Sequence, residues 1–293
     1  MIPEKPRFKP LDAVWLALFA AFGLYIWHRV HYGLQYQGDW SEIPRFLFRR
    51  DPDTGGLVPN HLIQGLAATI RLSVWSVLLG SVIGIVMGLL RAGKNLFFRL
   101  TAGAYVELIR NLPPLVLIFV FYFFVVDQFL PLLGAEAFIR DLSPGARAVF
   151  ETLFAQERLF VQFISGVAAI GFLEGAYITE IIRAGIQSVE KGQREAGRAL
   201  GLSRLDRMRF IILPQAVRRV LPPLANEFIN AVKYSAIASV VSIQELTFMG
   251  RQVVETTRLI FETWITVSVM YLSLTLSLSL LVGRLEKKLG RID

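Results

Sequence analysis

The sequence contains no cysteine, and only three of its 293 residues are histidine. Disulfide bonds and thiolate metal sites are therefore excluded. The histidines, His28, His31 and His61, lie in one predicted loop and at its edges, so we expect no zinc site. Charged residues are also few, at 18%, whereas 54% of the chain is hydrophobic and the mean hydropathy is +0.51. This composition excludes an ordinary soluble domain and predicts an all-α integral membrane protein.

A basic polar stretch, residues 188–214, lies between two of the most apolar parts of the chain, and we call it the elbow. Residues 193–200 are rich in helix formers, and Gly201 follows as a residue that can close a helix in the left-handed conformation. Ser203 opens a second helix as its N-cap, with an aspartate three residues on. Leu213-Pro214 is expected to stop or kink that helix. The elbow is therefore predicted to be two short helices joined by a tight turn.

The elbow resembles the EAA loop of importer-type ABC permeases, in which the first short helix docks into a groove on a separate ATPase subunit. The residues that carry this resemblance, and the ATPase-coupling role that it implies, are Glu195, Ala196, Gly197, Gly201, Leu213 and Pro214. Gly197 stands where the family usually has alanine, which costs about 1 kcal/mol of helix propensity.

Three further segments resemble the polar amino-acid uptake branch of this family, the histidine, glutamine, glutamate and arginine type. They are residues 105–114, Gly175-Ala176-Tyr177 with Glu180 and Arg183, and residues 221–228. The similarity covers the chain from about residue 64 to the C-terminus, with the motifs in the family's order. It implies a core of five transmembrane helices.

The apolar runs predict six transmembrane helices, the five-helix importer core plus one N-terminal helix. They cover residues 11–27, 62–90, 104–126, 159–182, 221–241 and 261–282. We expect Pro113-Pro114 to interrupt the third span and the fifth to begin after Pro222-Pro223. Residues 1–61 would form an uncleaved signal-anchor helix and an outer loop, with an interfacial helix over 43–48, and residues 62–293 the transmembrane domain with the elbow. The outer segment 127–158 is too interrupted to span and should form short interfacial helices.

Orientation follows from where the 31 lysines and arginines fall. With the elbow in the cytoplasm, the inner segments hold about twice as many as the outer ones, as the positive-inside rule requires. This predicts a multi-pass protein of the bacterial cytoplasmic (inner) membrane with both termini in the cytoplasm. It also accounts for the net charge of +8 without nucleic acid. A DNA-binding helix-turn-helix is rejected because the elbow has bilayer on both sides.

Residues 88–95, GLLRAGKN, match the spacing of a phosphate-binding loop. However, Asn95 stands where that loop requires serine or threonine, and the segment follows a predicted spanning helix rather than a strand. We therefore expect no cofactor and no ATP hydrolysis on this chain, with ATP and magnesium on the partner ATPase. The sequence also offers no cluster of residues of the kind that a membrane enzyme would need.

The second span carries Ser76, Gly80, Gly84 and Gly88 at four-residue spacing. Small residues on one stripe allow another helix to approach closely, which is how helices associate in lipid. The alternative is a flexible helix with incidental glycines. We expect the stripe to be a helix-packing face.

Ionisable residues within spans are costly, at least about 2.5 kcal/mol each near the bilayer centre, and normally face a partner or a water-filled path. Glu174 lies in the fourth span, and Glu227 and Lys233 lie in the fifth beside Asn226; these four are the candidate residues of a substrate path. Mutual neutralisation, or contact with a neighbouring subunit, is an equally weighted alternative. Glu107 and Arg110 in the third span are expected to neutralise each other.

Taken with the resemblance, these features predict the permease subunit of an ATP-driven importer of polar amino acids. The resemblance implies a cytoplasmic ABC ATPase dimer, a second permease subunit, identical or not, and an extracytoplasmic amino-acid-binding protein as partners. The alternative is a secondary, ion-driven amino-acid transporter, which should show inverted repeats and paired broken helices. The sequence shows neither.

Overall fold

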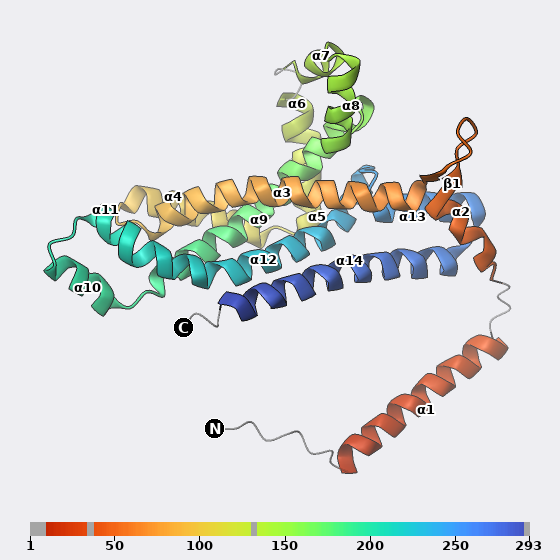
Figure 1. The fold of residues 1–293 in the computed structure, drawn as a ribbon, viewed down its shortest axis with the longest axis horizontal. Helices are drawn as coiled ribbons and strands as arrows, with labels where there is room; N and C mark the ends of the chain where they lie inside the picture. Colours follow the sequence, from red (N-terminus) through yellow and green to blue (C-terminus); the bar gives the residue numbers. More distant parts are fainter. Residues whose placement is uncertain (1–9, 34–37, 130–133, 290–293) are drawn as a thin grey trace. The chain divides into compact units, whose positions relative to one another are not determined.

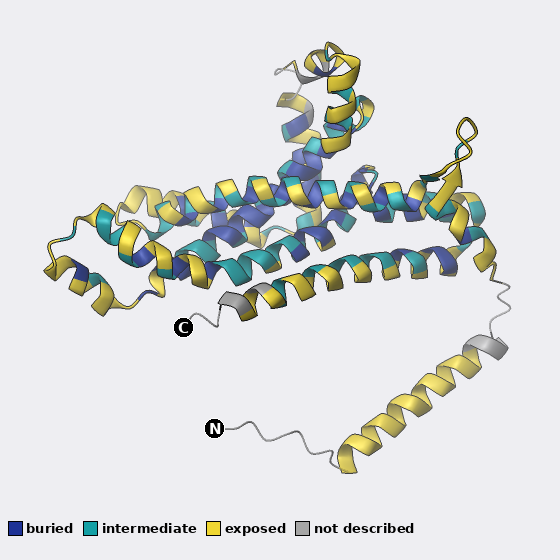
Figure 2. Cartoon of the chain, in the orientation of Figure 1, coloured by how far each residue is buried: buried dark blue, intermediate teal, exposed yellow. Residues whose placement is uncertain are grey.

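The structure, a computed structural model, describes residues 10–33, 38–129 and 134–289, which form two compact units that divide between Trp40 and Ser41. The first unit consists mainly of helix α1 (Pro10–Gly33). Every side chain described in this helix is exposed (Figure 2). Its apolar part, Pro10–Arg29, is long enough to cross a membrane, as predicted for the first span.

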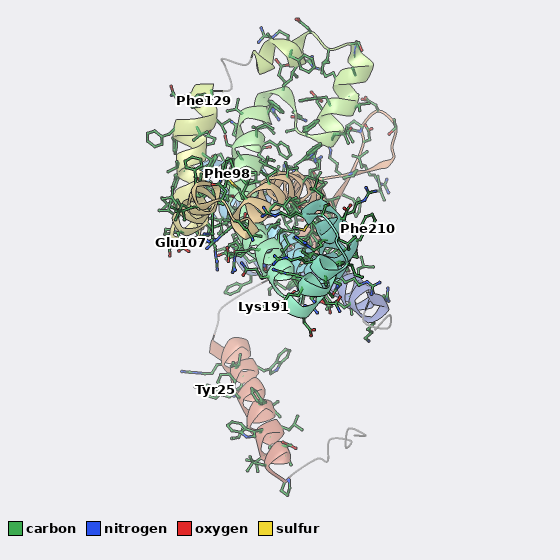
Figure 3. All side chains as sticks on the ribbon, turned by 90° about the vertical axis from the view of Figure 1, so that its left-hand side faces the viewer. Tyr25, Phe98, Glu107, Phe129, Lys191 and Phe210 are labelled. Atoms are coloured by element: carbon green, nitrogen blue, oxygen red, sulfur yellow. The ribbon has the colours of Figure 1, made fainter. Side chains whose placement is uncertain are left out.

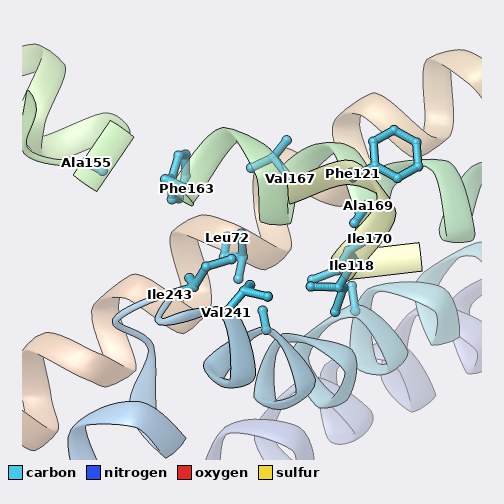
Figure 4. Packing of buried hydrophobic residues seen from close by; sticks show 12 residues of the cluster. Leu72, Ile118, Phe121, Ala155, Phe163, Val167, Ala169, Ile170, Val241 and Ile243 are labelled. Atoms are coloured by element: carbon cyan, nitrogen blue, oxygen red, sulfur yellow. The ribbon is translucent and has the colours of Figure 1, made fainter. Parts of the chain in front are cut away.

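The second unit is built from long helices around one buried helix (Figure 1). They are α3 (His61–Ala92), α4 (Leu96–Asn111), α5 (Pro114–Val120), α9 (Phe160–Gln187), α12 (Leu213–Ala238), α13 (Leu246–Thr257) and α14 (Ile260–Leu289). Helix α9 packs against α3, α4, α5 and α12, and Figure 2 shows most of its middle buried. The main apolar cluster includes Leu72, Ile118, Phe163, Ile170 and Ile243 (Figure 4). These residues join α3, α5, α9 and the loop before α13.

The start of the second unit, residues 41–60, is more ordered than the predicted outer loop. It contains helix α2 (Ile43–Leu47) and an antiparallel pair, β1 (Phe48–Arg50) with β2 (Leu57–Pro59). Phe46 and Leu47 pack against the buried Leu62 and Leu246, so this segment belongs to the second unit. The sequence predicts a domain boundary after residue 61, whereas the compact units divide between Trp40 and Ser41.

The outer segment folds into short helices, as predicted: α6 (Asp127–Phe129), α7 (Ala135–Arg140) and α8 (Pro144–Leu153). They rise from the long helices in Figure 1. The end of α8 is attached to α3 because the Trp75 indole donates to the Leu153 carbonyl at 2.9 Å and stacks on Phe154. The guanidinium of Arg71 donates to the Glu151 carbonyl, also at 2.9 Å.

Four helices in the described ranges are long and apolar enough to cross a membrane, or five if α4 and the following helix through Val126 count as one bent span. The membrane class and the helical fold are thus as predicted. The predicted fifth span is a helix, α12, but it does not meet the same criterion. Its charged residues, Arg218, Arg219, Glu227 and Lys233, lower its mean hydropathy.

Two of the predicted proline effects differ in the structure. Pro222 and Pro223 lie inside α12, which begins at Leu213 instead of after the proline pair. The second elbow helix, α11 (Arg204–Asp206), also does not stop at Pro214, because the π-helix η5 (Arg207–Ile212) joins it to α12. The Leu213 amide donates to the Met208 carbonyl five residues earlier. Such a π turn lets the helix continue past a proline that cannot donate.

At Pro113-Pro114 the effect is larger than predicted. Helix α4 ends at Asn111, and the chain turns by 108° before the apolar helix that begins at Pro114. Proline fixes φ and disfavours helical backbone in the residue before it, so two in succession terminate α4. The third predicted span is therefore a broken one.

Candidate functional site

The elbow turn is closed by local hydrogen bonds. Gly201 follows α10 (Lys191–Ala199) with φ of +74°, the left-handed conformation. The Leu202 amide donates to the Gly197 carbonyl at 3.1 Å and the Gly201 amide to the Arg198 carbonyl at 3.0 Å, which is the Schellman arrangement. The Ser203 hydroxyl then accepts from the Asp206 amide at 3.1 Å and caps the next helix.

Gly197 is buried where α10 lies against η5. A Cβ added there would meet the end of the Ile211 side chain at 2.5 Å and the Arg207 side chain at 3.1 Å. Glycine at this position therefore allows the first elbow helix to pack closely on the second. The approach compensates for glycine's weak helix propensity.

The elbow is attached to both long helices that flank it. Arg194 donates to the carbonyl of Ile186 near the end of α9, and Arg219 of α12 donates to the Ser188 carbonyl. Beneath these bonds an apolar cluster joins α9, the elbow and α12: Ile186, Val189, Ile212 and Ala216. The elbow is therefore anchored to both α9 and α12.

Several side chains of the elbow are exposed. Glu195 and Ala196 are exposed, and Leu200, Leu205 and Phe210 are 79%, 81% and 62% exposed. Figure 3 looks onto this end, with Lys191 and Phe210 labelled. Large apolar side chains gathered among basic residues on an exposed surface are typical of a protein-binding site.

The small-residue stripe of α3 faces α9. A Cβ on Gly80 would lie 2.9 Å from the Glu174 Cβ and 3.0 Å from the Gly171 carbonyl oxygen. On Gly84 it would overlap the Ile178 side chain, and on Gly88 it would lie 2.7 Å from the Ile182 Cβ. Ser76, one turn before Gly80, is also buried. The backbones of α3 and α9 thus lie close together along three turns of α3.

The charges of α4 do not pair as predicted. Glu107 lies 3.8 Å from Arg91 of α3, while the Arg110 guanidinium lies 5.0 Å above the ring of Tyr177. Arg91 also pairs with Glu180 of α9, whose carboxylate accepts from Arg183 at 2.8 Å. Glu107 and Arg110 do not pair with each other, because Arg91 of α3 and Tyr177 of α9 are within their reach.

The four candidate path residues differ in how far they are buried. Glu174 is completely buried, and Glu227 of α12 is its half-buried acidic neighbour. Asn226 and Lys233 are exposed on α12. In the described part of the chain, neither Glu174 nor Glu227 forms an ion pair, so the predicted alternative of a Glu174–Lys233 pair is wrong.

The segment 88–95 has no phosphate-loop geometry. Gly88 is within α3, Gly93 ends that helix, and the Asn95 side chain caps α4 by accepting from the Phe97 amide at 3.0 Å. The asparagine that breaks the sequence match is therefore an N-cap.

A cavity of about 1130 Å³ lies at the other end of α3 from the elbow, between the β1–β2 pair, α3 and α8. It contains none of the predicted site residues. Its lining includes Arg49, Ile63, Arg71, Arg158, Gln162 and Phe163.

Comparison with known proteins agrees with this geometry. Residues 80–291 match the family described as binding-protein-dependent transport system inner membrane component. The probable glutamine ABC transporter permease protein GlnM of Bacillus subtilis (strain 168) is 36% identical over 229 residues, 78% of this chain and 93% of the relative. The glutamine transport system permease protein GlnP of Escherichia coli (strain K12) is 34% identical over 228 residues, 78% of this chain and 92% of the relative.

Solved structures agree as well. An amino acid ABC transporter crystallised with histidines matches with a TM-score of 0.62 and 32% identity, over 78% of this chain and 93% of that one. A subunit of the MetNI methionine ABC transporter shares the fold alone, with a TM-score of 0.58 and 19% identity, over 78% and 96%. The chain belongs to the family of binding-protein-dependent transport system inner membrane components, the permease subunits of ABC importers.

Proposed function

We propose that this chain is the transmembrane subunit of an importer of polar amino acids, driven by a separate ATPase that docks on the elbow. The observation that carries the proposal is the elbow itself, a rigid helical pair with an exposed apolar face and with bonds to both α9 and α12. Similar permeases are named as glutamine transporters, which supports an amino acid as the cargo.

The elbow has the properties that a mechanical coupling element needs. Its exposed residues Glu195 and Leu200 offer contacts to a partner, whereas Gly197 and Ile212 hold it against the rest of the chain. When the ATPase dimer closes on ATP, the elbow would move and rotate α9 and α12 with it. Rigid-body motion of packed helices is the usual form of such a transition.

The position of the arginines on α3 supports a cytoplasmic location for the elbow. Arg71 and Arg91 are twenty residues apart, about 30 Å along the helix, which is the thickness of the hydrocarbon core. Arg91 lies at the end nearer the elbow, and the elbow carries the largest concentration of basic residues. By the positive-inside rule, this end would lie in the cytoplasm and the cavity beside α8 would lie outside.

The architecture supports two partners, a second permease subunit and the ATPase. The chain supplies one elbow and one broken third span, so an enclosed path needs a second permease subunit, and each elbow needs an ATPase. A soluble binding protein would deliver the amino acid from outside.

The proposal is tested by ATP-dependent uptake. Proteoliposomes containing the permease, its ATPase and the binding protein should accumulate a labelled polar amino acid only when ATP is enclosed with the ATPase. An ATPase variant unable to hydrolyse ATP is the control and should abolish accumulation. If the permease alone took up the amino acid in response to an ion gradient, this would contradict the proposal and favour a secondary transporter.

A further inference from the structure

Glu174 is a buried carboxylate without a partner. It is 0% exposed, and neither of its carboxylate oxygens has a hydrogen bond among the described residues. Its backbone lies where Gly80 of α3 makes its closest approach to α9. An unsatisfied acid at this depth is costly, so some group absent from a single chain should satisfy it.

The surroundings of Glu174 add negative charge and polar atoms. Glu227 of α12 is the second carboxylate, and the Asn230 amide donates to its Oε2 at 3.2 Å. Tyr234 packs with Tyr177 on an apolar cluster that includes Leu173, the residue before Glu174.

No described basic side chain forms an ion pair with either acid. Arg110 stacks on Tyr177, and Lys233 is exposed. The cluster therefore has two acids and no paired cation.

A continuous polar arc connects this cluster to the surface of α12. At about 100° per residue, Glu227 and Tyr234 project to nearly the same side of the helix, and Asn230 lies next to them. Asn226 and Lys233 come next around the helix and are exposed, whereas Glu227 and Asn230 are half-buried. A ligand at the α12 surface therefore meets amide and ammonium groups first and the two carboxylates deeper.

We propose that Glu174 and Glu227 bind the cationic side chain of a basic amino acid, which makes this a permease for basic amino acids. The inference rests on the proposed function and names the charge class of its substrate. An ammonium offers three donors and a guanidinium five, and neither brings an acceptor, so either matches oxygens that only accept. The exposed Lys233 can meet the α-carboxylate of the same ligand.

Neutral and acidic amino acids fit this cluster less well. Glutamine has only one cationic group, its α-ammonium, and an α-carboxylate. Glutamate adds a second carboxylate, which both acids repel. A metal ion is also a poor match, because calcium takes six to eight oxygen ligands and the described residues hold no group of three acids or histidines that could bind a metal. The expected order of affinity is arginine, then glutamine, then glutamate.

The test measures binding to the purified permease–ATPase complex without the binding protein, so that the permease alone decides selectivity. Labelled L-arginine should bind at least about tenfold more tightly than L-glutamine, because hydrogen bonds between charged groups are stronger than those between neutral groups. Glu174→Gln should weaken arginine binding about tenfold and reduce the ratio of the two affinities. Glu227→Gln, at a half-buried position, should act in the same direction and decides the matter if Glu174→Gln is not recovered folded.

Glu255→Gln is the matched control, because the Glu255 side chain is 65% exposed on α13. It should leave arginine binding unchanged. Equal affinity for arginine and glutamine in the wild type, unchanged arginine affinity in both acid variants, or competition by calcium chloride would overturn the inference. ATP-dependent uptake of a neutral amino acid by the same complex would leave the proposed function intact and reject only the basic substrate class.

Discussion

Gly84→Leu should prevent the permease from folding into a stable, monodisperse protein. A leucine side chain would have to occupy the space of the Ile178 side chain, and a Cβ at Gly84 already lies 3.2 Å from the Gly175 carbonyl oxygen. Neither helix can withdraw easily, because α9 also packs against α4, α5 and α12. Overpacking by even a few methylenes costs about 1–3 kcal/mol, and four added carbons against backbone should exceed this. Size-exclusion profile and thermal unfolding in detergent are the measurements.

Gly283→Leu in α14 is the control for that experiment. A Cβ at Gly283 would meet nothing within 4 Å, and the substitution adds helix propensity. This variant should be as stable as the wild type. If Gly84→Leu and Gly283→Leu unfold at the same temperature, the stripe of α3 is not a packing face.

Gly201→Val should abolish coupling between ATP hydrolysis and uptake while the permease still inserts and folds. The glycine has φ of +74°, and valine in the left-handed region costs about 1–3 kcal/mol, enough to open the turn between α10 and α11. Glu195→Lys should also weaken ATPase binding, because it reverses the charge of an exposed residue on α10. Substrate-stimulated ATPase activity and ATPase co-purification report both effects.

Gly201→Asn separates conformation from side-chain bulk. Asparagine tolerates the left-handed region, so this variant should retain most of the coupling that valine destroys. Normal uptake by both Gly201→Val and Glu195→Lys would show that the elbow does not bind the ATPase.

The elbow turn is predictable from sequence because its signals are local. A glycine that ends a helix and a serine that begins the next act within a few residues, and the structure shows both Gly201 and Ser203 in these roles. That the helix continues past Pro214 is not predictable from such local signals. It depends on the π turn before Leu213, which is stabilised where Ile212 packs with Ile186 and Ala216.

Residues that depend on a distant partner were harder to predict. The four-residue spacing from Ser76 to Gly88 indicates a packing face, but nothing in α3 indicates that α9 lies against it. The sequence places Glu174 within the fourth span, yet its enclosure depends on α3 and α12.

Helix α13 was missed altogether. Its pattern is short and amphipathic, with buried residues at 246, 249, 250 and 253, and its N-cap Glu245 accepts from the Phe248 amide at 2.8 Å. Its 12 residues are too few to cross a membrane, so the apolar runs that predict spans do not include it. The capping glutamate followed by apolar residues at helical spacing is the signal that could have found it.

The absence of cysteine makes one measurement especially direct. A single cysteine introduced by Glu195→Cys at the elbow can be cross-linked with a thiol–amine reagent in the assembled complex, without background from this chain. We expect a permease–ATPase product from Glu195→Cys. We expect none from Asp53→Cys, which places the thiol in the β1–β2 turn at the opposite end of α3. Cross-linking of the ATPase to Asp53→Cys, or none to Glu195→Cys, would contradict the claim that this permease is driven through its elbow.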